Sequence, residues 1–212
     1  MVSILKKSPK TEKLPSEKNI LRVAKKHFLI YGFAGARMQA IADEAGINKA
    51  LLHYYYKSKD GLFTKVFDDE ARSVITSIEK ITDQKLPILE KIRQLIVNDI
   101  DHLLKNREMP MFMMRELARD PKLIQKFDPG ARAENVLKKI AIEIAQAKKN
   151  KIIRADVEIA DIFINMGALA VFPILADPLC RQSFHMTEGG YTNWLEERKK
   201  TVPDFIIRAI KT

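Results

Sequence analysis

The chain has 212 residues, of which 46% are hydrophobic and 30% charged, and its formal net charge is +10. This mixture is typical of a folded globular protein with a sizeable core and excludes an intrinsically disordered chain. No apolar run approaches the ~18 residues that a membrane span requires, and the first ten residues have too short an apolar core for a signal peptide. The single cysteine, Cys180, cannot form an intramolecular disulfide, so a reducing compartment such as the cytoplasm is expected.

The positive charge is concentrated near the N-terminus. Residues 1–60 carry twelve Lys/Arg against five Asp/Glu, whereas residues 61–212 carry twenty-five against twenty-two. A local surplus of this kind is expected where a protein neutralises nucleic-acid phosphates. A lysine-rich tail that only improves solubility is the alternative, and residues 1–15, which lack periodicity and contain two prolines, are predicted to be a flexible basic arm.

The first helix is predicted to begin at a Ser16 cap and to end at Gly32. A second, short helix follows, because apolar residues recur at i, i+3, i+4 and i+7 from Met38 to Ala45. Gly46 suits a left-handed helix end, and Asn48 suits the N-cap of a third helix. Two short helices joined in this way form a helix-turn-helix, whose second helix can enter the DNA major groove.

The third helix, from Lys49 to about Tyr55, is predicted to expose a polar rim. At roughly 100° per residue, Leu51, Leu52 and Tyr56 point inward. Such a rim suits a groove, since Lys or His donates to guanine or phosphate acceptors, Ala meets a thymine methyl, and Tyr stacks or donates. The alternative for the tyrosines is packing under the next helix, which we favour for Tyr56 only. The outward residues are Lys49, Ala50, His53 and Tyr54.

The rest of the chain shows helical spacing throughout, with no strand alternation and no repeats. The prediction is therefore an all-α fold of about nine helices: an N-terminal three-helix domain with the helix-turn-helix, then a C-terminal helical domain. Further helices are expected from Ser58, from Pro87, at Pro110, over 131–149 after a break at Asp128-Pro129-Gly130, from Asp156, and from about Tyr191 to Ile210 with a bend near Pro203.

Residues 16–63 resemble the N-terminal domain of the tetracycline-repressor (TetR) family of bacterial transcriptional regulators. The resemblance implies a homodimer in which helices eight and nine of two chains form a four-helix bundle, and an effector cavity among helices four to eight. It assigns residues 1–15 to the arm, 16–63 to DNA binding, and 64–212 to effector binding and dimerisation. The residues that carry it are Ile20 to Phe28, Tyr31-Gly32-Phe33, Ile41 to Ile47, Lys49, Leu52, Tyr56 and Ser58-Lys59.

This sequence departs from the family's usual pattern near the predicted DNA contacts. Ala36-Arg37 stands where Thr-Ser or Thr-Thr usually opens the second helix, so Arg37 can contact a phosphate but cannot cap that helix. Ala50 replaces a usual Gly, while His53 and Tyr55 replace a common Tyr and His. These changes concern operator preference rather than the fold.

The predicted DNA-binding residues combine the outward rim with neighbouring polar groups. By resemblance, Tyr55 contacts phosphate, and Lys59 holds a phosphate together with the N-terminal amides of the fourth helix. Gln39 and Asn48 are expected to make phosphate or capping contacts. The full set is Arg37, Gln39, Asn48, Lys49, Ala50, His53, Tyr54, Tyr55 and Lys59.

The C-terminal half is predicted to hold an apolar effector and the dimer interface. Methionines cluster between 109 and 114, and flexible methionine suits varied apolar ligands, although filling gaps in the core is the alternative for each residue. The predicted effector residues are Phe67, His102, Phe112, Met113, Met114, Glu116, Phe163, Met166 and Phe172. The predicted dimer residues are Ile162, Leu169, Trp194, Phe205, Ile206 and Ile210.

The sequence offers no catalytic or metal-binding constellation. Asp101 and His102 are adjacent on a helix and so do not face each other. Four scattered histidines and one cysteine lack metal-site spacing, and no Gly-rich phosphate loop or nucleophile motif appears. We therefore expect no enzyme activity, cofactor or metal.

The expected function is a cytoplasmic, ligand-responsive bacterial repressor that binds a palindromic operator as a dimer. One alternative is a constitutive DNA-binding dimer without an effector. The other is an all-helical enzyme or interaction module with a vestigial helix-turn-helix. The expected partners are operator DNA, a second copy of the chain, and a largely apolar small molecule.

Overall fold

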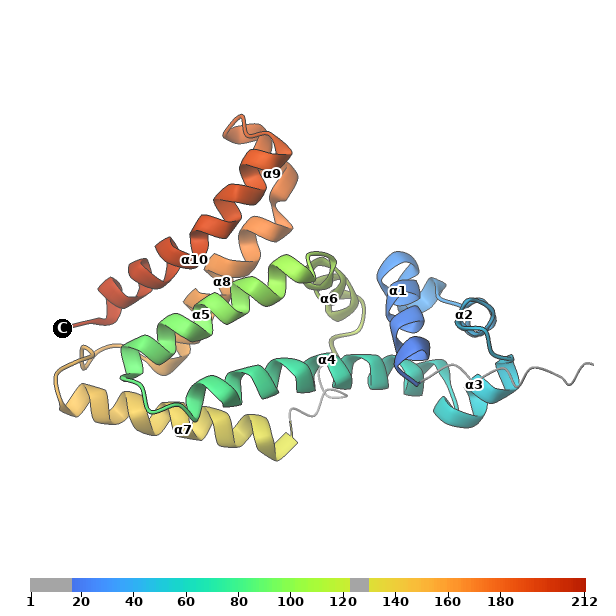
Figure 1. The fold of residues 1–212 in the computed structure, drawn as a ribbon, viewed down its shortest axis with the longest axis horizontal. Coiled ribbons are helices and arrows are strands. Elements are labelled where there is room, and N and C mark those ends of the chain that lie inside the picture. Colours follow the sequence, from blue (N-terminus) through green and yellow to red (C-terminus); the bar gives the residue numbers. More distant parts are fainter. Residues whose placement is uncertain (1–16, 123–129) are drawn as a thin grey trace, which may run out of the picture. The chain divides into compact units, whose positions relative to one another are not determined.

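A computed structural model describes residues 17–122 and 130–212, and within these ranges every regular element is a helix (Figure 1). The basic arm, the Ser16 cap and the break at Asp128-Pro129 lie outside the described residues. The chain divides into two compact units, the first ending at Val66 and the second beginning at Phe67. The all-α prediction is confirmed, with ten α-helices in the described ranges where about nine were expected.

The first unit contains three helices and the start of a fourth. Its elements are α1 (Glu17–Gly35), α2 (Met38–Ala45), α3 (Lys49–Tyr56) and the first turns of α4 (Lys59–Thr82). Helix α1 is interrupted at Gly32, whose φ of 68° lies in the left-handed region that glycine tolerates. The regular part of α1 therefore ends at Gly32, as the sequence predicted. A further helical turn follows and ends at Gly35.

The turn between α2 and α3 has the geometry that its sequence predicted. Gly46 adopts φ 73° and ψ 32°, and its N–H donates to the carbonyls of Ala42 and Asp43. Asn48 caps α3, because its side-chain oxygen accepts a hydrogen bond from the Leu51 N–H at 2.7 Å. Both predicted caps are confirmed, and they fix the relative orientation of the two helices.

A second tight turn joins α3 to α4. Lys57 has a positive φ of 60°, which is strained for a residue with a side chain. Ser58 caps α4 by accepting a hydrogen bond from the Gly61 N–H at 3.0 Å. A Cβ on Gly61 would lie 2.3 Å from the carbonyl oxygen of Tyr56, so only glycine fits where the end of α3 meets the first turn of α4.

The second unit is a helical bundle around one apolar core. Helices α8 and α10 pack against α5, and the core residues of α7 join the same cluster (Figure 1). Most of α4 belongs to this unit. The other elements are α5 (Ile88–Lys105), α6 (Glu108–Arg119), α7 (Gly130–Lys149), α8 (Ile159–Leu175), α9 (Asp177–Ser183) and α10 (Glu188–Ile210).

In this unit one predicted boundary needs correction, and one helix was not predicted. Helix α8 begins at Ile159 rather than Asp156, because Asp156 forms a two-point ion pair with Arg154 in the preceding turn. The short helix α9 was not predicted, since seven residues beginning with Asp177-Pro178 offer too little apolar periodicity to distinguish a helix from a loop. It lies between the two long helices that the sequence had treated as consecutive.

No single helix in the described ranges is long and apolar enough to cross a membrane. Helices α8 and α9 reach the required length and apolarity only when taken together, and they are bent by 76° relative to each other.

Gly61→Ala is expected to destabilise the first unit by on the order of 2 kcal/mol, because the added methyl group would collide with the Tyr56 backbone. Gly189→Ala is the matched control: its Cβ would meet no atom within 4 Å, so stability should stay the same or rise slightly. Urea denaturation followed by circular dichroism at 222 nm measures both. Equal stability of the two variants would contradict the close approach of α3 and α4.

Candidate nucleic-acid interface

The exposed rim of α3 has the polarity expected of a surface that meets DNA. Lys49, Ala50 and His53 are exposed, and the Tyr54 side chain is 69% exposed. Leu52 and Tyr56, on the opposite side of the helix, are buried and fix its rotation. Tyr55, which helical phase placed nearer the inside, is 57% exposed because the helix ends one residue later. The four rim residues thus form one continuous polar strip.

The His53 ring has a defined hydrogen-bonding state within this rim. Its Nδ1 lies 3.2 Å from the carbonyl oxygen of Lys57, and a carbonyl can only accept, so Nδ1 carries the hydrogen. In the neutral ring the outward Nε2 is then an acceptor. The sequence analysis expected His53 to donate to guanine, whereas this arrangement suits the amino groups of adenine or cytosine.

Lys57 is a basic residue of this surface that the sequence analysis missed. Its ammonium lies 5.1 Å from the centre of the Tyr54 ring, within the range of a cation–π interaction. Tyr54 also meets Tyr55 edge-to-face, with ring centres 5.5 Å apart. These contacts orient Tyr54 on the rim. The left-handed backbone of Lys57 places its side chain there, and no simple sequence signal predicts that conformation.

Lys59 has intramolecular partners in this structure. Its ammonium donates hydrogen bonds to the carbonyls of Ala34 at 3.1 Å and Ala36 at 3.2 Å, and it lies 4.8 Å from the centre of the Phe33 ring. These contacts tie the start of α4 to the chain that enters α2. The Lys59 side chain therefore stabilises the first unit. Its contact with a DNA phosphate remains a prediction.

The remaining predicted DNA contacts lie at the ends and outer face of α2 and α3. Arg37 is exposed at the N-cap of α2 and provides no side-chain cap, as expected from the loss of the usual hydroxyl. Gln39 donates to Asp43 at 2.7 Å, and Asn48 is used as the cap of α3. Asn48 is thus occupied in a structural role, whereas Arg37 is available on the surface.

A polar network of Glu44, Lys26 and His27 joins α2 to α1. The Glu44 carboxylate lies 2.8 Å from the ammonium of Lys26 and 2.8 Å from Nε2 of buried His27. A hollow of about 320 Å³ adjoins this network and is lined by His27, Tyr31, Gly35, Arg37 and Ala40. The hydrogen bond from Lys26, followed by that from His27, lowers the pKa of Glu44 below its ordinary value of 4.5.

Comparison with known proteins agrees with this geometry. Residues 20–66 match the family described as bacterial regulatory proteins, tetR family. This match covers α1 from Ile20, the helix-turn-helix and the first turns of α4. The family's members are bacterial regulatory proteins, and the named relatives below are HTH-type transcriptional regulators.

Relatives of known name are similar at modest identity. The "Probable HTH-type transcriptional regulator YttP" of Bacillus subtilis is 26% identical over 54% of this chain and 56% of its own length. The chain thus matches little more than half of that protein. The "HTH-type transcriptional repressor NicS" of Pseudomonas putida is 27% identical over 73% of both chains. The fold is shared with FadR from Bacillus subtilis in complex with stearoyl-CoA, at TM-score 0.64 and 14% identity, over 91% of this chain and 98% of that one.

The residues predicted to bind an effector are only partly brought together. Phe67 and Phe112 stack in parallel, with ring centres 5.3 Å apart, and both are buried in the second unit. Met166 belongs to the main core, with Phe163 packed against it, while His102 and Met113 are half-buried. These residues remain compatible with an internal ligand site.

Three of the effector residues require correction. Met114 and Phe172 are 56% and 60% exposed, so they do not line an interior site. Glu116 is buried, but its carboxylate is bound by Arg119 at 2.9 Å and is not a free polar anchor. Methionine content and helix spacing could not separate the inner side of α6 from its outer side.

The predicted dimer interface also needs correction. Ile162, Ile206 and Ile210 lie in the core of their own chain, and Leu169 packs against that core. Trp194 is half-buried and stacks on Tyr191, with ring centres 5.3 Å apart. Of the six predicted residues only Phe205 is largely exposed. The sequence pattern did not identify which side of α8 packs into its own chain, because this helix is apolar on nearly every side.

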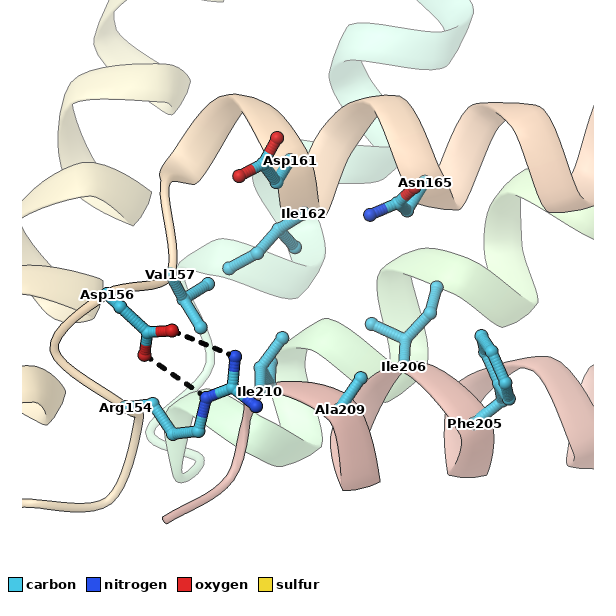
Figure 2. A pocket seen from close by; sticks show the side chains of 10 residues that line it. All are labelled: Arg154, Asp156, Val157, Asp161, Ile162, Asn165, Phe205, Ile206, Ala209 and Ile210. Carbon is cyan, nitrogen blue, oxygen red and sulfur yellow. Dashed lines mark hydrogen bonds and ion pairs between the residues drawn. The ribbon is translucent and has the colours of Figure 1, made fainter.

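The outer side of α8 and α10 does carry an exposed apolar surface. Ile164, Ala168 and Phe172 follow one another at four-residue intervals on α8, and all three are exposed. On α10, Phe205 and Ala209 lie at the edge of a hollow of about 350 Å³ that also includes Asp161 and Asn165 (Figure 2). We call Ile164, Ala168, Phe172 and Phe205 the outer stripe.

Within the described ranges, no group of three or more His, Cys, Asp or Glu side chains is placed to hold a metal ion. The thiol of Cys180 is free and partly buried.

Glu44→Gln is expected to lower stability at about pH 6, and the loss should shrink as the pH falls through 4.5. A carboxylate whose pKa is lowered by folding adds stability above its ordinary pKa and loses that contribution when it is protonated. Urea midpoints at several pH values test this. Lys26→Met and the double variant complete a mutant cycle, and strictly additive effects at pH 6 would show that the ion pair contributes nothing.

Proposed function

We propose that this protein is a ligand-responsive repressor that binds a palindromic operator as a dimer. The proposal rests on one observation above all: α3 exposes its polar rim while its apolar side is buried in the first unit. A helix held in this way can enter a major groove without unfolding any part of the domain.

The proposed base contacts come from the rim, and the proposed phosphate contacts come from the residues around it. Lys49 and Arg37 supply charge, Ala50 offers a methyl group, and Tyr54 offers a hydroxyl group. His53, with its Nδ1 engaged, would accept a hydrogen bond from the amino group of adenine or cytosine. The concentration of basic residues in positions 1–60 supports the phosphate contacts.

The proposed dimer forms through the outer stripe. Large apolar side chains in one contiguous exposed surface usually mark an interaction site. A two-fold dimer buries the same surface of both subunits, so one apolar stripe is sufficient. Two recognition helices related by that axis would reach operator half-sites one helical turn, roughly 34–36 Å, or a multiple of it apart.

The repressor and effector parts of the proposal are supported by the relatives. NicS is named a repressor, and FadR from Bacillus subtilis was solved with a small molecule, stearoyl-CoA. A ligand can release the operator only if it binds the non-operator conformation more tightly. We place the site in the second unit, and the protein acts together with DNA in the bacterial cytoplasm.

A gel shift with the DNA upstream of the protein's own gene tests the function directly. A discrete complex that forms with this DNA, but not with unrelated DNA at the same salt concentration, is expected. Release of the complex by a small molecule would separate a responsive repressor from a constitutive DNA-binding dimer. Absence of any sequence-specific complex would refute the proposed function.

Lys49→Ala is expected to weaken binding to all DNA sequences, because it removes one phosphate-neutralising charge. The slope of log K against log salt concentration should fall by about 0.9 for that phosphate. Lys80→Ala is the matched control: Lys80 is exposed on α4 in the second unit, and its removal should leave the slope unchanged. An unaltered slope for Lys49→Ala would remove Lys49 from the phosphate contacts.

Phe172→Glu is expected to convert the dimer to a monomer, because burying an unpaired carboxylate in an interface costs several kcal/mol. Analytical ultracentrifugation at micromolar concentration measures the change. Ile142→Glu is the control, because Ile142 is 70% exposed on α7, away from the outer stripe. A Phe172→Glu protein that remains dimeric would show that the subunits associate elsewhere.

A further inference from the structure

Helix α5 carries a carboxylate in the middle of its buried face. In an α-helix, positions four residues apart lie on the same side. Leu95, one turn before Asp99, and Leu103, one turn after it, both belong to the core of the second unit, as does Ile92 two turns before. Asp99 therefore lies on the side of α5 that faces the interior of the bundle.

Two polar residues of α5 next to Asp99, Asn98 and Asp101, have partners. Asn98 donates a hydrogen bond to the Ser77 hydroxyl of α4 at 3.0 Å. On the other side of the helix, Asp101 forms an ion pair with Lys199 of α10. Asp99 has neither a hydrogen-bond donor nor a cation among the described residues. Loss of hydration is the cause of the raised pKa of its carboxyl group. Asp99 differs in this from the buried Lys91, which binds the Thr82 carbonyl and Glu143.

An unpaired carboxylate in such a place is costly and therefore calls for an explanation. Loss of water around the charged form raises the pKa of Asp99 to about 6. The carboxylate is nevertheless not sealed, since no fully buried side-chain oxygen or nitrogen in the described ranges lacks a partner. The Asp99 oxygens are thus partly accessible to water, in agreement with the intermediate exposure of this residue.

The surroundings of Asp99 fit a ligand with an apolar body. Helix α8 packs against α5, and its Met166 lies in the same core cluster as Leu95 and Leu103, with Phe163 packed against that cluster. His102 lies one turn further along α5 on a neighbouring side and is half-buried. The acceptor groups and the apolar groups are therefore present together in the second unit, where the effector is proposed to bind.

We propose that Asp99 is the polar anchor of the effector site and that the effector is an apolar molecule carrying a protonated amine. This inference rests on the proposed function, because it assumes that an effector binds in the second unit. An ammonium group would give the carboxylate the charge-assisted partner that it lacks. A carboxylic acid would be repelled, and a neutral alcohol would leave the charge unpaired.

The test uses three isosteric probes, 4-phenylbutylamine, 4-phenylbutanol and 4-phenylbutyrate, together with a panel of larger aryl and alkyl amines, each with its matched alcohol and acid. Binding to the full-length protein is measured by thermal shift and by calorimetry. Amines are expected to raise the melting temperature, while their matched acids and alcohols do not. Amines that bind no better than their acids and alcohols, or a panel in which no amine binds, would overturn the proposal.

Asp99→Asn and Asp99→Leu test the anchor itself. Both are expected to weaken amine binding at least about tenfold, since a hydrogen bond to a charged group is lost. Both should also raise the melting temperature of the ligand-free protein at pH 7.5, because an unpaired buried charge has been removed. A merely structural aspartate would lower that temperature when replaced. Asp101→Asn, two residues away on another side of α5, is the control and should bind amines like the unmodified chain.

The gel shift separates this inference from the function on which it rests. An operator complex that is released by an acid or a neutral ligand, and not by any amine, would leave the repressor intact and refute the role of Asp99. A protein that binds amines through Asp99 but forms no specific DNA complex would uphold the anchor and refute the proposed function.

Discussion

Leu52 and Tyr56 lie one turn apart on α3, and both are buried beneath the helix. Because neither side chain can leave the core without exposing apolar surface, they fix the rotation of α3 about its own axis. The turn that follows fixes its direction as well, since Gly61 leaves no room between the Tyr56 carbonyl and the first turn of α4. Every proposed base contact depends on this constraint.

The corner between α3 and α4 also has a consequence for regulation. Helix α4 begins in the first unit and continues into the second without interruption. Lys59 binds carbonyls of the chain that enters α2, while Gly61 contacts the end of α3. The first turn of α4 is therefore linked to the end of α3 by a close backbone approach and to the chain entering α2 by the Lys59 side chain.

Helix α8 serves two surfaces at once. One side supplies Ile162, Met166 and Ala170 to the core of its own chain, and the other carries the exposed outer stripe. This arrangement explains why the helix is apolar around most of its circumference although it does not lie wholly inside the subunit. In the proposed dimer both sides would be buried, the first by folding and the second by association.

Two buried charged residues of the second unit have charged partners, whereas the partly buried Asp99 has none. Lys91 and Glu116 are buried, and each is held by an oppositely charged side chain. These pairs offset the loss of hydration. The Lys91–Glu143 pair also joins α5 to α7, whereas Glu116 and Arg119 both lie on α6. Asp99 has no such partner among the described residues. An unpaired charge at one place in an otherwise satisfied interior is what distinguishes a binding site from a structural ion pair.

The amino-acid sequence alone determined the features that depend on local chemistry: the left-handed Gly46, the Asn48 cap, the polar rim of α3 and the all-helical class. Each of these follows from residues within a few positions of one another. Only the tertiary structure decided which side of α8 faces its own core, which α6 residues are buried, and that Asp99 is unpaired. Periodicity shows which side of a helix is apolar, but not which element packs against that side. An acidic residue in a helix is predicted to be exposed, and only the packing of other helices shows that it faces the interior.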